Sequence, residues 1–154
     1  MSVKAIPEGY HTITPYMTVR DAARAIEFYK QAFGAVEKGT MKGPDGKVMH
    51  SELRIGDSLI MLADEFPEYG SFAPKDGAGA SGLHIYTEDV DGAFERAVKA
   101  GAVVEMPVSD MFWGDRYGKL VDPFGHKWSI ATHKRDMTTE EMEEAMHEMM
   151  PKSA

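Results

Sequence analysis

Two segments of this chain repeat one order of elements, and this repeat constrains the fold more than any other feature. The first segment, about residues 10–65, opens with a run of β-branched and aromatic residues, passes through Asp21 into a helix that a glycine ends, and closes with three strand-like runs. The second, about residues 81–134, has the same order, with Asp89 before its helix. The sequence therefore predicts two β-α-β-β-β units.

Turn residues divide the strand-like runs within each unit. Gly43-Pro44-Asp45-Gly46 and Gly56-Asp57 separate the runs of the first unit, and Asp122-Pro123-Phe124-Gly125 precedes the last run of the second. An offset of 68 residues places Asp21 on Asp89, but few other positions are identical. The shared order of elements, rather than residue identity, supports the repeat.

Composition limits the classes of protein to which this chain can belong. Its 154 residues, 43% of them hydrophobic, suit one domain over residues 1–154. It contains no cysteine, which excludes disulfides and thiolate sites, and we expect a cytoplasmic protein. With a net charge of −8 and no long apolar segment, we expect neither nucleic-acid binding nor membrane association.

The end of the chain predicts a separate amphipathic helix over about residues 138–150. Thr138 and Glu141 have the spacing of a capping box. Met142, Met146 and Met149 then recur on one helical face. We expect this face to pack against the domain or against a second subunit, in preference to acting as a methionine-rich binding face.

Alternation along the strands separates two kinds of side chain. One set, such as Leu83 and Ile85, is apolar and suits packing against helices. The opposite set is mixed in polarity, and a curved sheet would turn it into a concave pocket. The predicted pocket residues are Thr14, Tyr16, Met61, Gly82, His84, Tyr86 and Ser129.

Four segments carry a resemblance to a known family. They are TPYMTVRDAARAIEFYKQAFGA (14–35), GDSLIMLADE (56–65), YTEDVDGAFERAVKAGA (86–102) and FWGDRYGKLVDPFGHKWSIATH (112–133). They resemble the vicinal oxygen chelate superfamily, which includes glyoxalase I, bleomycin-resistance proteins and extradiol dioxygenases, and the last segment looks most like the PhnB-like branch. The resemblance implies an α+β fold in which the two units form a curved eight-stranded mixed sheet, and it implies a homodimer.

The resemblance also locates the positions that bind metal in enzymes of this superfamily. Those enzymes take histidine or carboxylate ligands from the first and last strands of each unit, positions that here correspond to Thr14, Met61, Gly82 and Ser129. A hydroxyl, a thioether and a glycine do not supply the donors that divalent metals prefer. We therefore expect no metal ligands and no cofactor at these positions.

Three further residues are candidates for binding. His84 could donate a hydrogen bond to a ligand, act as an acid or base, or serve as a displaced metal ligand. Alternatively, polar neighbours within the protein satisfy its hydrogen bonds, and it has no functional role. Trp113 offers a stacking surface and Arg116 a forked donor for an anion. Alternatively, Arg116 pairs with Asp115 or another acid and Trp113 covers an apolar core.

The leading functional hypothesis is a protein that binds a small, partly aromatic or anionic organic molecule without the usual metal centre. The alternative is a metal-dependent glyoxalase-like lyase or isomerase, or a dioxygenase, that uses non-standard ligands such as His84. A structural role with the pocket filled by the protein's own side chains is a third possibility. The sequence assigns no catalytic residue.

Overall fold

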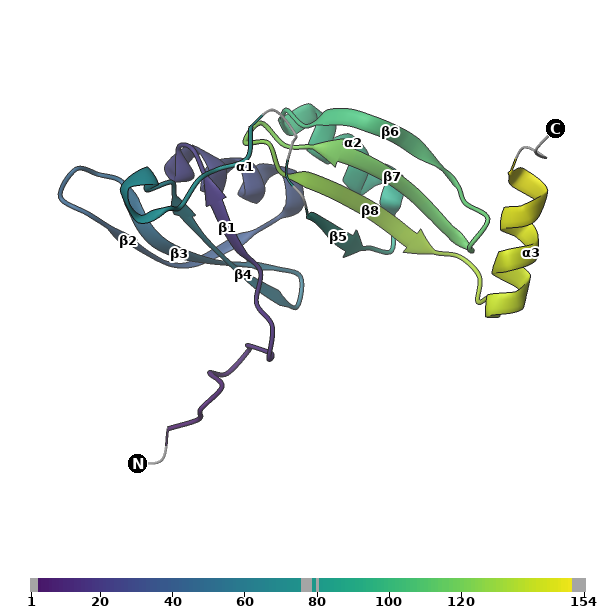
Figure 1. The fold of residues 1–154 in the computed structure, drawn as a ribbon, viewed down its shortest axis with the longest axis horizontal. Coiled ribbons are helices and arrows are strands. Elements are labelled where there is room, and N and C mark those ends of the chain that lie inside the picture. The colour runs from purple at the N-terminus through teal and green to yellow at the C-terminus, as the bar shows by residue number, and fades with distance from the viewer. Residues whose placement is uncertain (1–2, 76–78, 80, 151–154) are drawn as a thin grey trace.

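The computed structural model describes residues 3–75, 79 and 81–150, and its elements follow the predicted order. Figure 1 shows the two units side by side. The first unit contains β1 (Tyr16–Val19), α1 (Ala22–Phe33), β2 (Val36–Lys42), β3 (Val48–Ile55) and β4 (Ser58–Asp64), followed by the short 3-10 helix η1 (Pro67–Tyr69). The second contains β5 (Gly82–Tyr86), α2 (Val90–Ala100), β6 (Val103–Asp110), β7 (Asp115–Val121) and β8 (Lys127–His133), followed by α3 (Thr139–Met149).

Each unit forms its own four-stranded mixed sheet. The strand orders are β1-β4-β3-β2 and β5-β8-β7-β6, with β1 parallel to β4, β5 parallel to β8, and the other pairs antiparallel. The predicted α+β class, with eight strands in two β-α-β-β-β units and a C-terminal helix, is confirmed. The hydrogen-bonded pairing is divided between two sheets, and β1 and β5 are edge strands of these sheets.

The acidic residue before each helix acts as its N-cap. Asp21 accepts a hydrogen bond from the backbone N–H of Arg24 at 3.3 Å, and Asp89 accepts one from Gly92 at 3.1 Å. Gly34 then ends α1 in the left-handed conformation, with a φ of 68°, and its N–H bonds back to the last turn. The repeated capping pattern in the sequence is therefore a repeated local structure.

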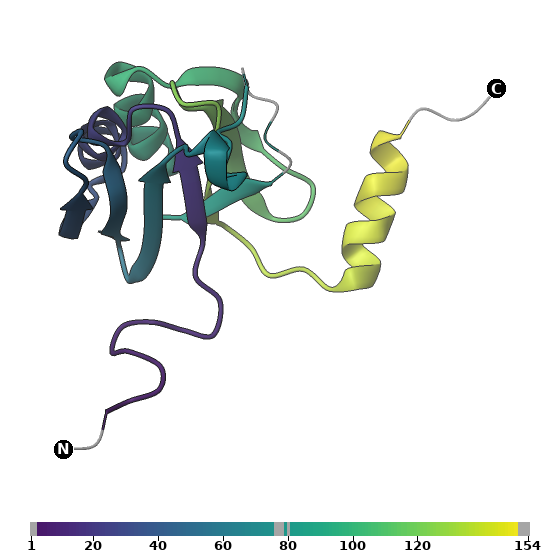
Figure 2. The ribbon, with the colours of Figure 1, turned by 60° about the vertical axis from the view of Figure 1, so that its left-hand side comes forward.

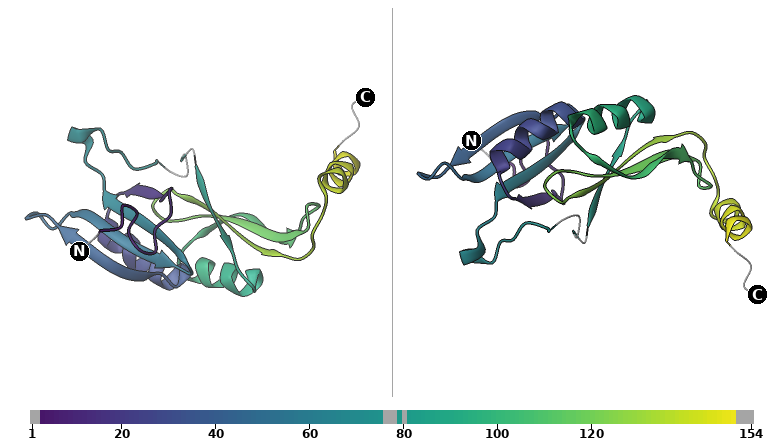
Figure 3. Two further views of the ribbon diagram at one scale, coloured as in Figure 1. Left: turned by 90° about the horizontal axis from the view of Figure 1, so that it is seen from below. Right: turned by 90° about the horizontal axis from the view of Figure 1, so that it is seen from above.

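Helices α1 and α2 lie next to each other on one side of the molecule (Figure 3). Arg96 of α2 donates to the carbonyl oxygens of Gln31 at 2.7 Å and Lys30 at 3.3 Å, at the end of α1. Since each helix also packs on its own sheet, this contact joins the two units. Neither α1 nor α2 covers the opposite faces of the two sheets, which we call the open faces.

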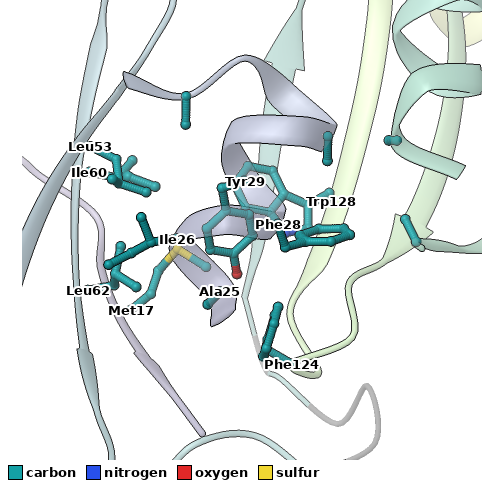
Figure 4. Close-up of a cluster of buried hydrophobic side chains, with 14 of the residues drawn as sticks. Met17, Ala25, Ile26, Phe28, Tyr29, Leu53, Ile60, Leu62, Phe124 and Trp128 are labelled. Carbon is teal, nitrogen blue, oxygen red and sulfur yellow. The ribbon is translucent and has the colours of Figure 1, made fainter. Parts of the chain in front are cut away.

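An aromatic core lies where the units meet (Figure 4). The Tyr29 and Trp128 rings are 5.5 Å apart, and both side chains donate to Asp122, at 2.6 Å from the Tyr29 hydroxyl and 2.9 Å from the Trp128 indole. Asp122 also accepts from the backbone of Phe124 and His126. Burial, and then the charge of Asp122, raises the pKa of Tyr29 well above its usual range.

Helix α3 stands apart from both sheets (Figure 2), and none of its residues is buried. The predicted capping contact is present, because the Thr138 hydroxyl accepts from the N–H of Glu141 at 3.1 Å. Within the described residues, its methionine face does not pack against the domain of the same chain, so the first of the two predicted packing partners is wrong. Packing against a second subunit stays a prediction. No described helix has both the length and the apolar character needed to span a membrane.

Candidate ligand-binding site

Strand alternation places His84 and Ser129 on the open face of the second sheet. Their neighbours Leu83 and Trp128 point toward the helices, in line with the half-buried and buried states of those side chains. His84 on β5 lies directly opposite Ser129 on β8, and its Nδ1 atom is 2.6 Å from the Ser129 hydroxyl oxygen. The structure therefore brings two predicted site residues into contact.

Aromatic rings surround His84. The Tyr86 ring lies edge-on at 4.6 Å and the Tyr117 ring stacks at 5.8 Å, while Trp113 packs on Tyr117 at 5.3 Å. Partial burial among these side chains lowers the pKa of His84, and the charge of Asp115 opposes the shift only in part. His84 is therefore mainly neutral near pH 7, when its imidazole can both donate and accept a hydrogen bond.

Asp115 is the buried acid of this face, with only 5% of its surface exposed. It accepts hydrogen bonds from the Tyr86 hydroxyl and the Trp113 indole, both at 3.2 Å, and it pairs with Nδ1 of His133 at 2.7 Å. The Asp115 charge raises the pKa of Tyr86. Hydrogen bonds to Asp136 and then to Asp115 raise the pKa of His133. His133 thus compensates the charge of Asp115.

The open face of the first sheet holds a second polar network. The Tyr16 hydroxyl lies 2.9 Å from Nδ1 of His50, and Nε2 of His50 is 3.7 Å from Glu52. The hydroxyl of Tyr10, from the segment before β1, donates to the same carboxylate. Burial and the contact with Glu52 raise the pKa of Tyr10 to about 12. Met61 lies opposite both Tyr16 and Glu52 in the strand register.

A cleft of about 670 Å³ runs along β5 between the two units. One wall is the segment before β1, another is the turn between β3 and β4, and the third is β5 itself. Phe33 and Trp128 contribute apolar surface to it. The predicted site residues in its lining are Thr14, Gly82, His84 and Tyr86. Because His84 and Tyr86 also belong to the open face, the cleft and that face form one continuous surface.

Arg116 is not brought together with the other predicted residues. Its guanidinium donates to both carboxylate oxygens of Asp91 on α2, at 2.8 and 2.9 Å, and to Asp110 at 3.3 Å. On β7, alternation sends Arg116 to the helix side while Asp115 and Tyr117 face the open side. The structure thus agrees with the alternative prediction for Arg116, in which its guanidinium pairs with an acidic side chain.

The strand register shows which residues of β1 and β5 lie opposite Met61 and Ser129. Tyr16, rather than Thr14, lies opposite Met61, and His84, rather than Gly82, lies opposite Ser129. Thr14 precedes β1, which begins only after Pro15. Pro15 has no backbone N–H with which to extend a strand ladder.

Several residues of these networks and of the open faces were not among the predicted site residues. They are Tyr10, His50, Glu52, Asp115, Tyr117, Lys119 and His133. On β7, alternation alone places Asp115, Tyr117 and Lys119 on one face, so this part of the signal was present in the sequence. The contact of Tyr10 with Glu52 joins residues that are 42 positions apart in the sequence, so it could be identified only from the three-dimensional fold.

A family model described as the Glyoxalase/Bleomycin resistance protein/Dioxygenase superfamily matches residues 10–130. The chain belongs to this superfamily. This confirms the resemblance found in the sequence, and the two β-α-β-β-β units account for almost all of the matched residues.

Relatives of this superfamily member cover most of its length. Rv0887c of Mycobacterium tuberculosis is 44% identical over 138 residues, which span 87% of this chain and 81% of that protein. The X-ray structure of At5g48480 from Arabidopsis thaliana is 31% identical, with a TM-score of 0.62 over 79% of this chain and 98% of that one. The PhnB protein of Bacillus cereus, at 19% identity, shares the fold with a TM-score of 0.63 over 79% of this chain and 99% of that one.

The residues of this superfamily member do not fit the family's metal. The positions that correspond to the family's ligands, Thr14, Met61, Gly82 and Ser129, supply two hydroxyls, a thioether and no donor from the glycine. Tyr16 and His84, which lie opposite Met61 and Ser129, would add only a phenol and an imidazole. This donor set is poor for a divalent ion, and Nδ1 of His84 is already bonded to Ser129. Within residues 3–75, 79 and 81–150, no three His, Asp or Glu side chains are arranged to hold a metal ion.

Proposed function

We propose that this superfamily member binds a small organic molecule on the open faces of its sheets and along the β5 cleft, without the usual metal centre. The observation that carries the proposal is the polar and aromatic open face of the second sheet. His84, Tyr86 and Ser129 present imidazole, phenol and hydroxyl groups there, next to a cleft of about 670 Å³. A few polar groups placed among aromatic side chains are typical of small-molecule sites.

We propose further that the protein acts as a homodimer in which a second copy covers the open faces. Tyr16 and Tyr86 are 54% and 63% exposed in the single chain, although both take part in hydrogen-bond networks. Large exposed apolar surface on the functional face supports burial against a partner. The ligand would then lie between the two copies.

The proposal is tested by screening a panel of fluorinated small molecules by ¹⁹F NMR against the wild type and against Thr14→Trp. The indole introduced at the cleft wall should compete with ligands, and we expect compounds that bind the wild type to lose at least about tenfold in affinity. Glu140→Trp, at an exposed position on the side of α3 away from its methionines, is the matched control and should bind like the wild type. Binding that Thr14→Trp leaves unchanged would place the site elsewhere.

Metal analysis of protein purified without an affinity tag provides a second readout. We expect far less than one divalent ion per chain, because the donor set at the four strand positions is poor. One tightly bound divalent ion per chain would contradict the proposal and would favour a metal-dependent lyase, isomerase or dioxygenase.

A further inference from the structure

The open face of the second sheet carries a row of hydrogen-bond donors across three strands. In the strand register, His84 on β5 lies opposite Ser129 on β8, and Ser129 lies opposite Lys119 on β7. Neighbouring strands are about 4.8 Å apart, so the imidazole, hydroxyl and ammonium groups lie within reach of one small ligand group. We call these three residues the donor row.

Lys119 is the cation that this face offers to a ligand. Lys127, one row away, is paired with Glu105 at 3.2 Å, and the guanidinium of Arg116 is held by Asp91 on the helix side. Among the described residues, Lys119 forms no ion pair. An anionic group of a ligand can therefore take a place that no carboxylate of the described chain occupies.

The acids at this face do not offset that charge, since Glu105 is already paired with Lys127 and Asp115 is held within the protein. Asp115 is buried and is hydrogen-bonded by three side chains, and His133 pairs directly with it. Because its oxygens are already satisfied within the protein, Asp115 has little capacity left to bind a ligand cation. The surface open to a ligand therefore selects for negative rather than positive charge.

The His84 and Ser129 pair leaves a donor free in either tautomer. If Nδ1 accepts from the Ser129 hydroxyl, the Nε2–H of His84 is available to the ligand. If Nδ1–H donates to the Ser129 oxygen, the hydroxyl hydrogen is available instead. Either arrangement adds a neutral donor beside the Lys119 ammonium.

The next row along the strands is aromatic. Ala131 lies opposite Tyr86 on one side and opposite Tyr117 on the other, so a small residue separates two phenol rings. Trp113 extends this surface from Tyr117, at a ring distance of 5.3 Å. Aromatic side chains favour stacked or edge-on contacts with flat rings. A flat ring next to an anionic group matches the aromatic row next to the donor row.

We propose, on the basis of the proposed function, that the ligand of this site is a flat aromatic carboxylate, with its carboxylate on the donor row and its ring against Tyr117 and Trp113. This assigns the charge-recognition role to Lys119. The earlier expectation of an anion on Arg116 is replaced, because Arg116 lies on the other face of β7.

Isothermal titration calorimetry with 2-naphthoate and with its uncharged analogue 2-naphthamide tests this inference. We expect the wild type to bind 2-naphthoate at least about tenfold more tightly than the amide. Lys119→Met should reduce naphthoate affinity about tenfold and leave amide affinity unchanged. Lys99→Met, which removes an exposed charge from α2, should behave like the wild type. Circular dichroism and melting temperature confirm that each variant is folded.

The outcomes separate this inference from the function on which it rests. Equal affinity for acid and amide, or naphthoate binding that Lys119→Met does not weaken, would overturn the aromatic carboxylate. Absence of naphthoate binding while other molecules of the ¹⁹F panel bind would also overturn it, and would leave the proposed function standing. Absence of binding by the whole panel would contradict both.

Discussion

Single residues connect the two units of this protein and maintain the charges of its open faces. Asp122 joins Tyr29 of the first unit to Trp128 of the second, through hydrogen bonds of 2.6 and 2.9 Å. On the open side, His133 bridges Asp115 and Asp136, with both contacts at 2.7 Å. The first set is buried and contributes to stability, whereas the second lies at the rim of the candidate site.

Replacement of Tyr29 by Phe tests the buried contact. The change removes one donor from a buried carboxylate, so we expect the free energy of unfolding to fall by about 2 kcal/mol in urea titrations. Tyr69→Phe, at a residue 82% exposed, is the matched control and should have no measurable effect. Equal stability of Tyr29→Phe and the wild type would show that the hydrogen bond from Tyr29 to Asp122 makes no net contribution to the free energy of unfolding.

The His133 bridge predicts a specific pH dependence. Its partners raise the pKa of His133 above the ordinary value of 6.5, so its stabilising effect is complete below about pH 6.5 and is lost as the pH rises through the folded-state pKa. Melting temperatures of the wild type and His133→Gln, measured from about pH 5 to about pH 9, should therefore differ most at low pH. A difference that grows with rising pH would contradict the bridge.

At the scale of elements, the sequence predicted the order of strands and helices well but predicted the first strand poorly. Asp21, Asp89 and the glycines after the helices mark local structure, which depends on adjacent residues. The run 12–19 is β-rich throughout, yet β1 begins at Tyr16, because pairing with β4 decides where the strand starts. This limit explains why Thr14, which lies within the predicted run, precedes β1 in the structure.

The candidate site shows the same limit in its side chains. His84, Tyr86 and Ser129 were predicted from alternation, which is a local property of each strand. Lys119 in a strand pattern is typical of a solvated charge, and only the pairing of β7 with β8 places it next to Ser129. Contacts between distant strands are set by register, which no single stretch of sequence specifies.

Packing of α2 on β7 makes a prediction at this scale. A methyl group added at Gly118 would lie 2.7 Å from the Phe94 ring and 2.9 Å from Val108, whereas one added at Gly39 of β2 meets nothing within 4 Å. We expect Gly118→Ala to cost about 1–3 kcal/mol of unfolding free energy and Gly39→Ala to be neutral or slightly stabilising. Similar effects of the two substitutions in chemical denaturation would contradict this packing.

At the scale of the whole molecule, α1 and α2 lie on one side and leave both open faces uncovered by these two helices (Figure 3). The units are held together by the aromatic core and by the contact of α1 with α2, while β1 and β5 are left as sheet edges. The proposed second copy would cover the exposed aromatic side chains of these faces.

Sedimentation velocity measures this association. We expect a species of twice the 17.0 kDa chain mass, and we expect Tyr16→Lys to shift it toward the monomer, because the charge would lie in the proposed interface. Tyr69→Lys, on η1, is the control and should remain dimeric. A wild-type protein that sediments as a monomer at all concentrations would contradict the proposed dimer.

The central claim is that the open face of the second sheet, continuous with the β5 cleft, is the ligand site. A ¹H–¹⁵N NMR titration of the wild type with the tightest-binding compound of the ¹⁹F panel tests it most directly. We predict that the largest shift changes occur at His84, Tyr86, Tyr117 and Ser129. Shift changes confined to the helix side, around Asp91 and Arg96, would contradict the claim.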